Sequence, residues 1–250
     1  MKKEKIAISI DKPTLEMVDA MVDRHTIRSR SQAIEFLVAK GIEHQYIKDA
    51  VILIRGSEAG TLFKIVEGRT VLAHHLDWLA EHGVKNALII TGREAPLSRI
   101  EQFCESHALR ARVIVEERSS GNIPALLLAK KELARNFILL LGDTVNMFDL
   151  TKMILFHLRS DKIATVGLIS SSIAKQYSQV ELEGDRIVEF RPERSDSSVI
   201  DAGIYIFKPT IFKHFTHGKR FFEKEVLPGL CHTNEIKGYF THGKYVHLGE

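Results

Sequence analysis

The spacing of apolar residues changes near residue 48, so the chain is predicted to contain two domains, residues 1–46 and 47–250. In the first domain, residues 5–10 alternate between apolar and polar, and this period of two predicts a half-buried strand. Two helices are predicted to follow, the second capped by Ser29, with apolar positions at Leu15, Val18, Met21, Val22, Ile34, Leu37, Val38 and Ile42. One strand and two helices cannot bury the three isoleucines of the strand, so the pattern predicts a homodimer or higher assembly in which two strands pair.

The order and spacing over residues 3–43 resemble the ribbon-helix-helix family of repressors. In that family a two-stranded ribbon enters the major groove of double-stranded DNA, and the start of the second helix holds a backbone phosphate. The resemblance implies six DNA-contacting residues, which are Lys5, Ala7, Ser9, Ser29, Arg30 and Ser31. Ala7 departs from the family, because it lacks a hydrogen-bonding side chain for a base edge. The alternative is that this domain only dimerises the rest of the chain.

From Val51 onward, apolar runs typical of buried strands alternate with amphipathic segments. Strands are predicted at 51–54, 87–91, 112–116, 137–141 and 201–207, helices at 70–82, 98–107 and 125–135, and a hairpin turning at Gly184-Asp185. This alternation predicts an α/β, doubly wound fold in which ligands bind outside the carboxyl ends of the strands.

Several blocks within residues 51–250 resemble, in order, the nucleotidyltransferases that activate sugar 1-phosphates with nucleoside triphosphates. The blocks are residues 75–79, 125–129, 140–143, 201–205 and 222–228. The resemblance implies a Rossmann-like, GT-A-like domain with a mixed sheet and a nucleotide, nucleotide-sugar or sugar-phosphate ligand. The candidate ligand-binding residues are Gly56, Ser57, Gly121, Asn122, Asp143 and Asp201.

Asp143 follows the most apolar run of the chain, and a carboxylate at such a strand end can hold a divalent cation against phosphate oxygens. The alternatives for Asp143 are a turn residue or a cap for a helix beginning near Leu150. The family has a second metal-binding Asp just before a Gly near the end of the domain, where this chain has His247-Leu248-Gly249. Asp143 and His247 are therefore the candidate metal ligands. An inactive domain is expected to have no cofactor. An active domain is expected to use Mg²⁺.

Departures from the family pattern favour an inactive domain with no catalytic residue. Active members carry a Gly-rich loop ending in Gly-Thr-Arg and then a Pro-Lys-Pro segment, and residues 55–64 have neither. Glu58 would repel a triphosphate. Arg55 or Lys64 could replace the missing Arg and Lys of the family, although neither stands at the matching position. Pro124 removes an N–H donor from the segment that approaches the base in the family. The sequence thus favours a DNA-binding transcriptional regulator with a nucleotidyltransferase-like sensor or interaction domain. The alternative is an active Mg²⁺-dependent sugar-1-phosphate nucleotidyltransferase that is dimerised or autoregulated through its first domain.

Composition changes this picture little. The net charge of +3 does not by itself indicate nucleic acid, and no apolar run reaches the length of a membrane span, so no membrane partner is expected. Cys104 and Cys231 lie far apart without metal-type spacing, which predicts two reduced thiols in a cytoplasmic protein.

Overall fold

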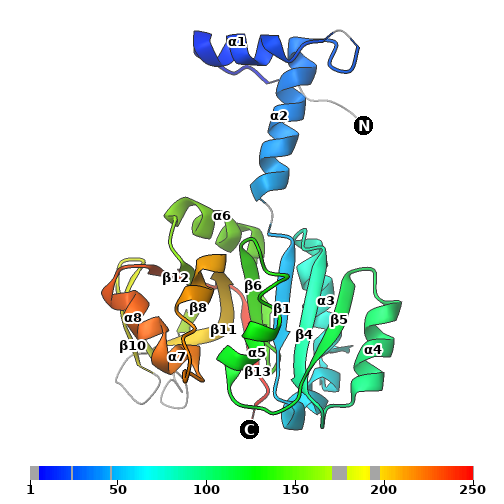
Figure 1. The fold of residues 1–250 in the computed structure, drawn as a ribbon, viewed down its shortest axis with the longest axis vertical. Coiled ribbons are helices and arrows are strands. Elements are labelled where there is room, and N and C mark those ends of the chain that lie inside the picture. The colour runs from blue at the N-terminus through cyan, green and yellow to red at the C-terminus, as the bar shows by residue number, and fades with distance from the viewer. Residues whose placement is uncertain (1–5, 24, 46, 171–178, 192–197, 250) are drawn as a thin grey trace. The chain divides into compact units, whose positions relative to one another are not determined.

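The structure is a computed structural model that describes residues 6–23, 25–45, 47–170, 179–191 and 198–249. The chain divides into two compact units, Met1–Tyr46 and Ile47–Glu250, which are drawn in Figure 1 and treated separately below. None of the helices in the described ranges combines the length and the apolar content that a membrane span needs.

Within its described residues, 6–23 and 25–45, the first unit contains two helices, α1 (Lys12–Ala20) and α2 (Arg30–Gln45). The Asp11 carboxylate caps α1 by accepting the Thr14 N–H at 3.0 Å, and Ser29 Oγ accepts the Gln32 N–H at 3.3 Å at the start of α2. Residues 6–10 form neither helix nor strand, so the predicted strand is wrong for the single chain. A strand requires a hydrogen-bonded neighbour, and no described segment pairs with these residues. Lys5 lies outside the described residues.

The second unit is built on a nine-stranded mixed sheet in the order β5-β4-β1-β6-β11-β8-β12-β10-β9 (Figure 1). The strands are β1 (Asp49–Leu53), β4 (Asn86–Gly92), β5 (Arg110–Glu116), β6 (Phe137–Leu141), β8 (Ala164–Ser170), β9 (Gln179–Glu183), β10 (Arg186–Arg191), β11 (Val199–Phe207) and β12 (Ile236–Phe240). Strands β5, β4, β1 and β6 are parallel, whereas β11 runs antiparallel to β6 and β8. The predicted α/β fold with a mixed sheet is confirmed.

Helices cover both faces of the sheet. One face packs against α3 (Val71–Glu81), α4 (Leu97–Ser106) and α6 (Leu150–Ser160), and the other against α5 (Asn122–Leu128), α7 (Phe222–Glu225) and α8 (Leu227–His232). Strand β1 shows why the run at 51–54 is continuously apolar: Ile52 enters one core, Val51 enters the other, and both are fully buried.

Short elements complete the unit and shape the carboxyl edge of the sheet. The connection from β1 to α3 consists of the 3₁₀ helix η1 (Gly56–Phe63) and the hairpin of β2 (Ile65–Val66) and β3 (Arg69–Thr70). Strand β7 (Thr144–Met147) pairs antiparallel with β13 (Lys244–His247), and a second 3₁₀ helix, η3 (Pro209–Lys213), follows β11. The pairing of β7 with β13 brings the end of the described chain beside the end of β6.

Two of the predicted elements have different outcomes. The hairpin at Gly184-Asp185 is confirmed, because β9 and β10 pair across it and Gly184 has a φ of 63°. The helix predicted over 125–135 is wrong beyond Leu128. There the chain turns so that Leu133 and Phe137 reach the core.

Candidate active site

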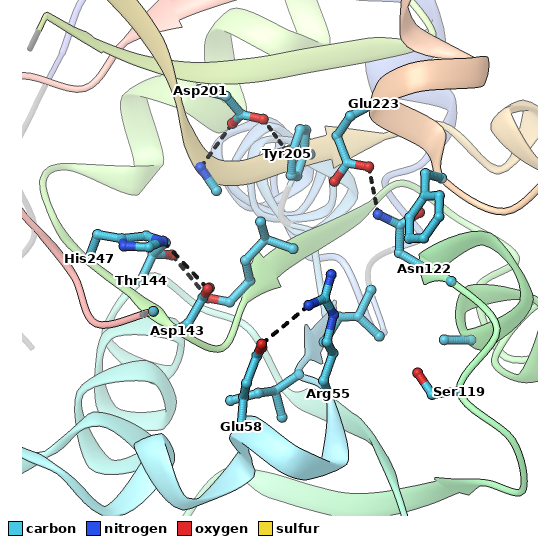
Figure 2. Close-up of a pocket in the computed structure, with 18 of the residues that line it drawn as sticks. Arg55, Glu58, Ser119, Asn122, Asp143, Thr144, Asp201, Tyr205, Glu223 and His247 are labelled. Carbon is cyan, nitrogen blue, oxygen red and sulfur yellow. Dashed lines mark hydrogen bonds and ion pairs between the residues drawn. The ribbon is translucent and has the colours of Figure 1, made fainter. Parts of the chain in front are cut away.

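A pocket of about 690 Å³ opens at the carboxyl ends of β1 and β6 (Figure 2). Its lining residues come from parts of the sequence that lie far apart: Leu53, Ile54, Arg55, Glu58, Glu116, Ser119, Gly121, Asn122, Ala125, Leu141, Asp143, Thr144, Asp201, Gly203, Tyr205, Arg220, Phe221, Glu223, Lys224, Tyr245, His247 and Gly249. Open α/β sheets bind ligands at this edge, and the volume is typical of a small-molecule site.

Four of the six predicted ligand residues line this pocket, namely Gly121, Asn122, Asp143 and Asp201. The other two do not. Gly56 is buried against the Glu94 side chain, so that a Cβ on Gly56 would lie 2.5 Å from Glu94 Cδ, and Ser57 is exposed. Ligand binding by any of these residues stays a prediction.

Asp143 lies in the turn between β6 and β7. The Gly142 N–H donates to the Leu53 carbonyl at 2.9 Å, which extends the pairing of β6 with β1 into this turn. Burial lowers the pKa of the His75 imidazole to about 4, against the opposing effect of its hydrogen bond to the Gly142 backbone. His75 is therefore neutral at pH 7 and supports the turn without adding charge. Asp143 is a turn residue and not a helix cap, because the N-cap of α6 is Asp149.

The predicted metal pair is close in space. His247 Nε2 lies 3.5 Å from Asp143 Oδ2, because β13 pairs His247 with Thr144 (Figure 2). Within the described ranges, no group of three or more His, Cys, Asp or Glu side chains forms a metal site. Mg²⁺ commonly takes one or two carboxylates and completes its coordination with substrate phosphates and water. Asp143 fits such a role, whereas the His247 nitrogen is a poor ligand for Mg²⁺.

Asp201 is a buried carboxyl in the wall of the pocket. Its carboxyl accepts the Gly203 N–H at 2.9 Å and the Tyr205 hydroxyl (Figure 2). Burial raises the pKa of Asp201 to about 7, although both of these hydrogen bonds oppose the rise. The local backbone requires glycine at 203, since its φ is +68° and a Cβ there would lie 2.9 Å from Thr144.

A second polar group joins α5 to α7. Asn122 Nδ2 donates to Glu223 Oε2 at 2.6 Å, and the Phe222 N–H donates to Asn122 Oδ1 at 2.9 Å. Burial raises the pKa of Glu223, and the Asn122 hydrogen bond opposes this shift. Pro124 occupies the first turn of α5, where backbone N–H groups lack intrahelical acceptors. The proline therefore removes no hydrogen bond from the helix itself.

These environments change the effective charge of the pocket. The pKa of Asp201 is about 7, so this carboxyl is partly protonated at pH 7 and the acidic lining is less negative than its composition indicates. Sequence reasoning did not select Tyr205, Arg220 or Glu223 as site residues. Tyr205 and Glu223 belong to blocks that carry the family resemblance, and this was the available signal.

Comparisons with known proteins agree on one family. The nucleotidyl transferase family matches residues 57–245. The mannose-1-phosphate guanylyltransferase catalytic subunit beta of Danio rerio is 24% identical over 192 residues, which cover 73% of this chain and 53% of that protein. The chain thus spans about half the length of the curated relatives it matches.

Solved structures show the same fold. HddC from Yersinia pseudotuberculosis, complexed with GMP-PN, matches with a TM-score of 0.68 and 20% identity over 82% of this chain and 95% of that chain. UDP-glucose pyrophosphorylase, complexed with UDP-glucose, matches with a TM-score of 0.65 and 15% identity over 82% of this chain and 94% of that chain.

The prediction of a DNA-binding transcriptional regulator is wrong. The curated relatives are named as guanylyltransferases, and two of the structural neighbours are complexed with GMP-PN and UDP-glucose, so the chain resembles sugar-phosphate nucleotidyltransferases and not DNA-binding regulators. The first unit offers a physical reason as well. Arg30, predicted to hold a DNA phosphate, has Nε and Nη2 each 2.7 Å from a carboxylate oxygen of Asp19. Ala7 and Ser9 are exposed but do not lie on a strand, and Ser29 Oγ is occupied by the Gln32 N–H.

Proposed function

Because the chain belongs to the nucleotidyl transferase family, we propose that it transfers a nucleotidyl group from a nucleoside triphosphate to a sugar 1-phosphate. The observation that carries this proposal is the Asp143 carboxylate in the wall of a nucleotide-sized pocket at the carboxyl edge of the sheet. The nucleotide and nucleotide-sugar ligands of the structural neighbours support the same class of substrate.

In the proposed reaction an oxygen of the sugar 1-phosphate attacks the α-phosphorus of the nucleoside triphosphate. The bond from that phosphorus to the β-phosphate oxygen breaks, pyrophosphate leaves, and a nucleotide sugar remains. Asp143 would hold Mg²⁺, which neutralises charge on phosphate oxygens when it is bound. Asn122 is fixed by Glu223 and the Phe222 N–H and forms a rigid polar wall for the base or the sugar. The partial protonation of Asp201 at pH 7 reduces repulsion of the phosphates.

The direct test is release of pyrophosphate by the full chain. Each of the four nucleoside triphosphates is combined with a panel of hexose 1-phosphates, with Mg²⁺ and with EDTA. We expect Mg²⁺-dependent pyrophosphate for at least one pair, together with an equal amount of nucleotide sugar. Absence of turnover across the whole panel would contradict the proposal.

We also propose that residues 1–46 associate with the same residues of a second copy. Among the side chains that the structure describes in the first unit, Val18 and Ala33 are the buried apolar ones, and six large apolar side chains are exposed: Ile6, Ile8, Met17, Phe36, Leu37 and Val38. A small unit needs a larger buried apolar core to be stable alone, and exposed apolar side chains become buried when an association surface forms. This supports the dimerisation that the strand and helix pattern predicted.

A mass measurement tests this association. Light scattering on the full chain is expected to give twice the 28.3 kDa of one chain. Leu37→Glu is expected to shift the protein toward the monomer, because burial of a carboxylate at an apolar interface is unfavourable. Ile65→Glu, at an exposed apolar position of the second unit, is the matched control and should leave the mass unchanged. A monomeric parent, or a dimer that Leu37→Glu leaves intact, would show the association to be elsewhere or absent.

A further inference from the structure

Arg55 is a pocket cation that the chain holds against its own carboxylate. The residue follows β1 directly and forms the N-cap of η1, which places its side chain in the pocket. Arg55 Nη1 lies 3.3 Å from Glu58 Oε1, and Figure 2 shows the two side chains rising together toward the pocket interior. Both residues line the pocket, and they lie three positions apart in the connection between β1 and α3.

The guanidinium of Arg55 has donors left for a ligand. Among the described residues, the hydrogen bond to Glu58 is the one that Arg55 makes through its side chain, and it engages Nη1 alone. The positive charge of Arg55 also acts on Glu223 across the pocket. Burial raises the pKa of Glu223, and the smaller electrostatic effect of Arg55 lowers it. A guanidinium with unoccupied donors in a pocket is suited to bidentate contact with phosphate oxygens.

The other arginine of the pocket is used differently. Arg220 Nε donates to the Ser120 carbonyl at 2.7 Å, and the Arg220 N–H donates to Glu225. Arg220 thus joins two segments of the wall, whereas within the described part of the chain Arg55 is held by the Glu58 side chain, which a ligand can displace. The Arg55–Glu58 pair is largely exposed, with 67% and 42% of the side chains accessible, and exposed pairs of this kind contribute little stability.

We propose, on the basis of the nucleotidyl transfer proposed above, that Arg55 is the main phosphate-binding side chain of this pocket and that Glu58 sets its selectivity by ligand charge. A phosphate that binds Arg55 displaces the Glu58 carboxylate or lies next to it. The repulsion from Glu58 grows with the negative charge of the ligand. Glu58 therefore weakens binding of a triphosphate more than binding of a monophosphate or a nucleotide sugar, and so reduces the affinity difference between substrate and product.

Calorimetric titrations at fixed ionic strength test this proposal. The four nucleoside triphosphates are screened first, and the best ligand is then compared with its own diphosphate and monophosphate. Glu58→Gln is expected to tighten binding of the triphosphate by about 10-fold and of the monophosphate by about threefold. Arg55→Ala is expected to weaken binding of every phosphate ligand by about 10-fold or more, and Arg55→Lys by less, because lysine keeps the charge but loses the bidentate geometry.

Glu105→Gln supplies the control, because it makes the same change in net charge at an exposed position on α4 outside the pocket. It should leave all affinities at the parental value. Equal gains for triphosphate and monophosphate in Glu58→Gln would overturn the selectivity role, and parental affinities in Arg55→Ala would overturn the phosphate role. Failure of every triphosphate to bind both the parent and Glu58→Gln would also overturn the proposal. Binding that follows the expected pattern without pyrophosphate release would support this inference while contradicting nucleotidyl transfer.

Discussion

Asp143→Asn is expected to lower the rate of Mg²⁺-dependent pyrophosphate release by roughly 10²–10³-fold. The amide has nearly the size of the carboxylate, so the turn after β6 and its support by His75 remain. It lacks the negative charge that holds a hard divalent cation against the phosphates. Binding of the nucleotide in EDTA should be unchanged or slightly tighter, because a negative charge has left the pocket wall.

The measurement is a steady-state rate over a range of Mg²⁺ concentrations, with nucleotide affinity determined separately in EDTA. Asp161→Asn is the matched control, since Asp161 is exposed, lies outside the pocket, and has a φ of 55° that asparagine tolerates. A parental rate in Asp143→Asn would remove Asp143 from the proposed mechanism. A loss of nucleotide binding in EDTA would instead indicate that the turn needs the carboxylate for its structure.

Asp201→Asn is expected to change the pH dependence of stability. The folded pKa of Asp201 is raised to about 7, above the ordinary value of 3.8. Folding therefore favours the protonated form of Asp201. The contribution of this group to the free energy of unfolding is fully present below pH 4 and is lost as the pH rises through 7. The shift corresponds to about 3–5 kcal/mol over that window. Relative to the parent, the asparagine variant should gain stability steadily between pH 4 and pH 7.

Urea denaturation of parent and variant at several pH values checks this expectation through the difference in their free energies of unfolding. That difference reports Asp201 together with its charge coupling to Glu223, whereas the buried His75 and His157 have no such coupling to Asp201 and titrate equally in both proteins. Tyr205→Phe provides a second variant. It removes a hydroxyl donor that lowers the pKa of Asp201. The pH range over which the stability contribution of Asp201 is lost should therefore move upward. A parent-to-variant difference that is the same at pH 4.5 and pH 7.5 would show that Asp201 is not the group responsible.

The raised pKa of Asp201 also connects stability with ligand binding. A carboxyl that is about half ionised at pH 7 adds negative charge to the pocket as the pH rises further. Phosphate ligands meet more repulsion under those conditions. Nucleotide affinity in the parent should therefore fall above pH 7, and Asp201→Asn should lose part of this dependence.

The family resemblance led to the right fold, and local deviations from the family pattern led to the wrong function. Residues 55–64 lack the Gly-Thr-Arg and Pro-Lys-Pro segments, and this absence favoured an inactive domain that served a DNA-binding regulator. In the structure these residues form η1 and place Arg55 in the pocket, a position that the sequence does not reveal. The resemblance of residues 3–43 to DNA-binding proteins also gave no indication that Arg30 pairs with Asp19.

The sequence by itself determined the elements whose signals are local. The apolar run 137–141 is β6, and the helical pattern at 70–82 contains α3, because the burial of these elements depends on side chains within one short segment. The sequence also placed Asp143 at the end of β6. Only the tertiary structure decided the site around it. The antiparallel insertion of β11 beside β6 brings Asp201 into the pocket, and the pairing of β13 with β7 brings His247 to Asp143. Such contacts join residues that are 58 and 104 positions from Asp143, and they depend on strand order and on burial, which periodicity along the chain does not encode.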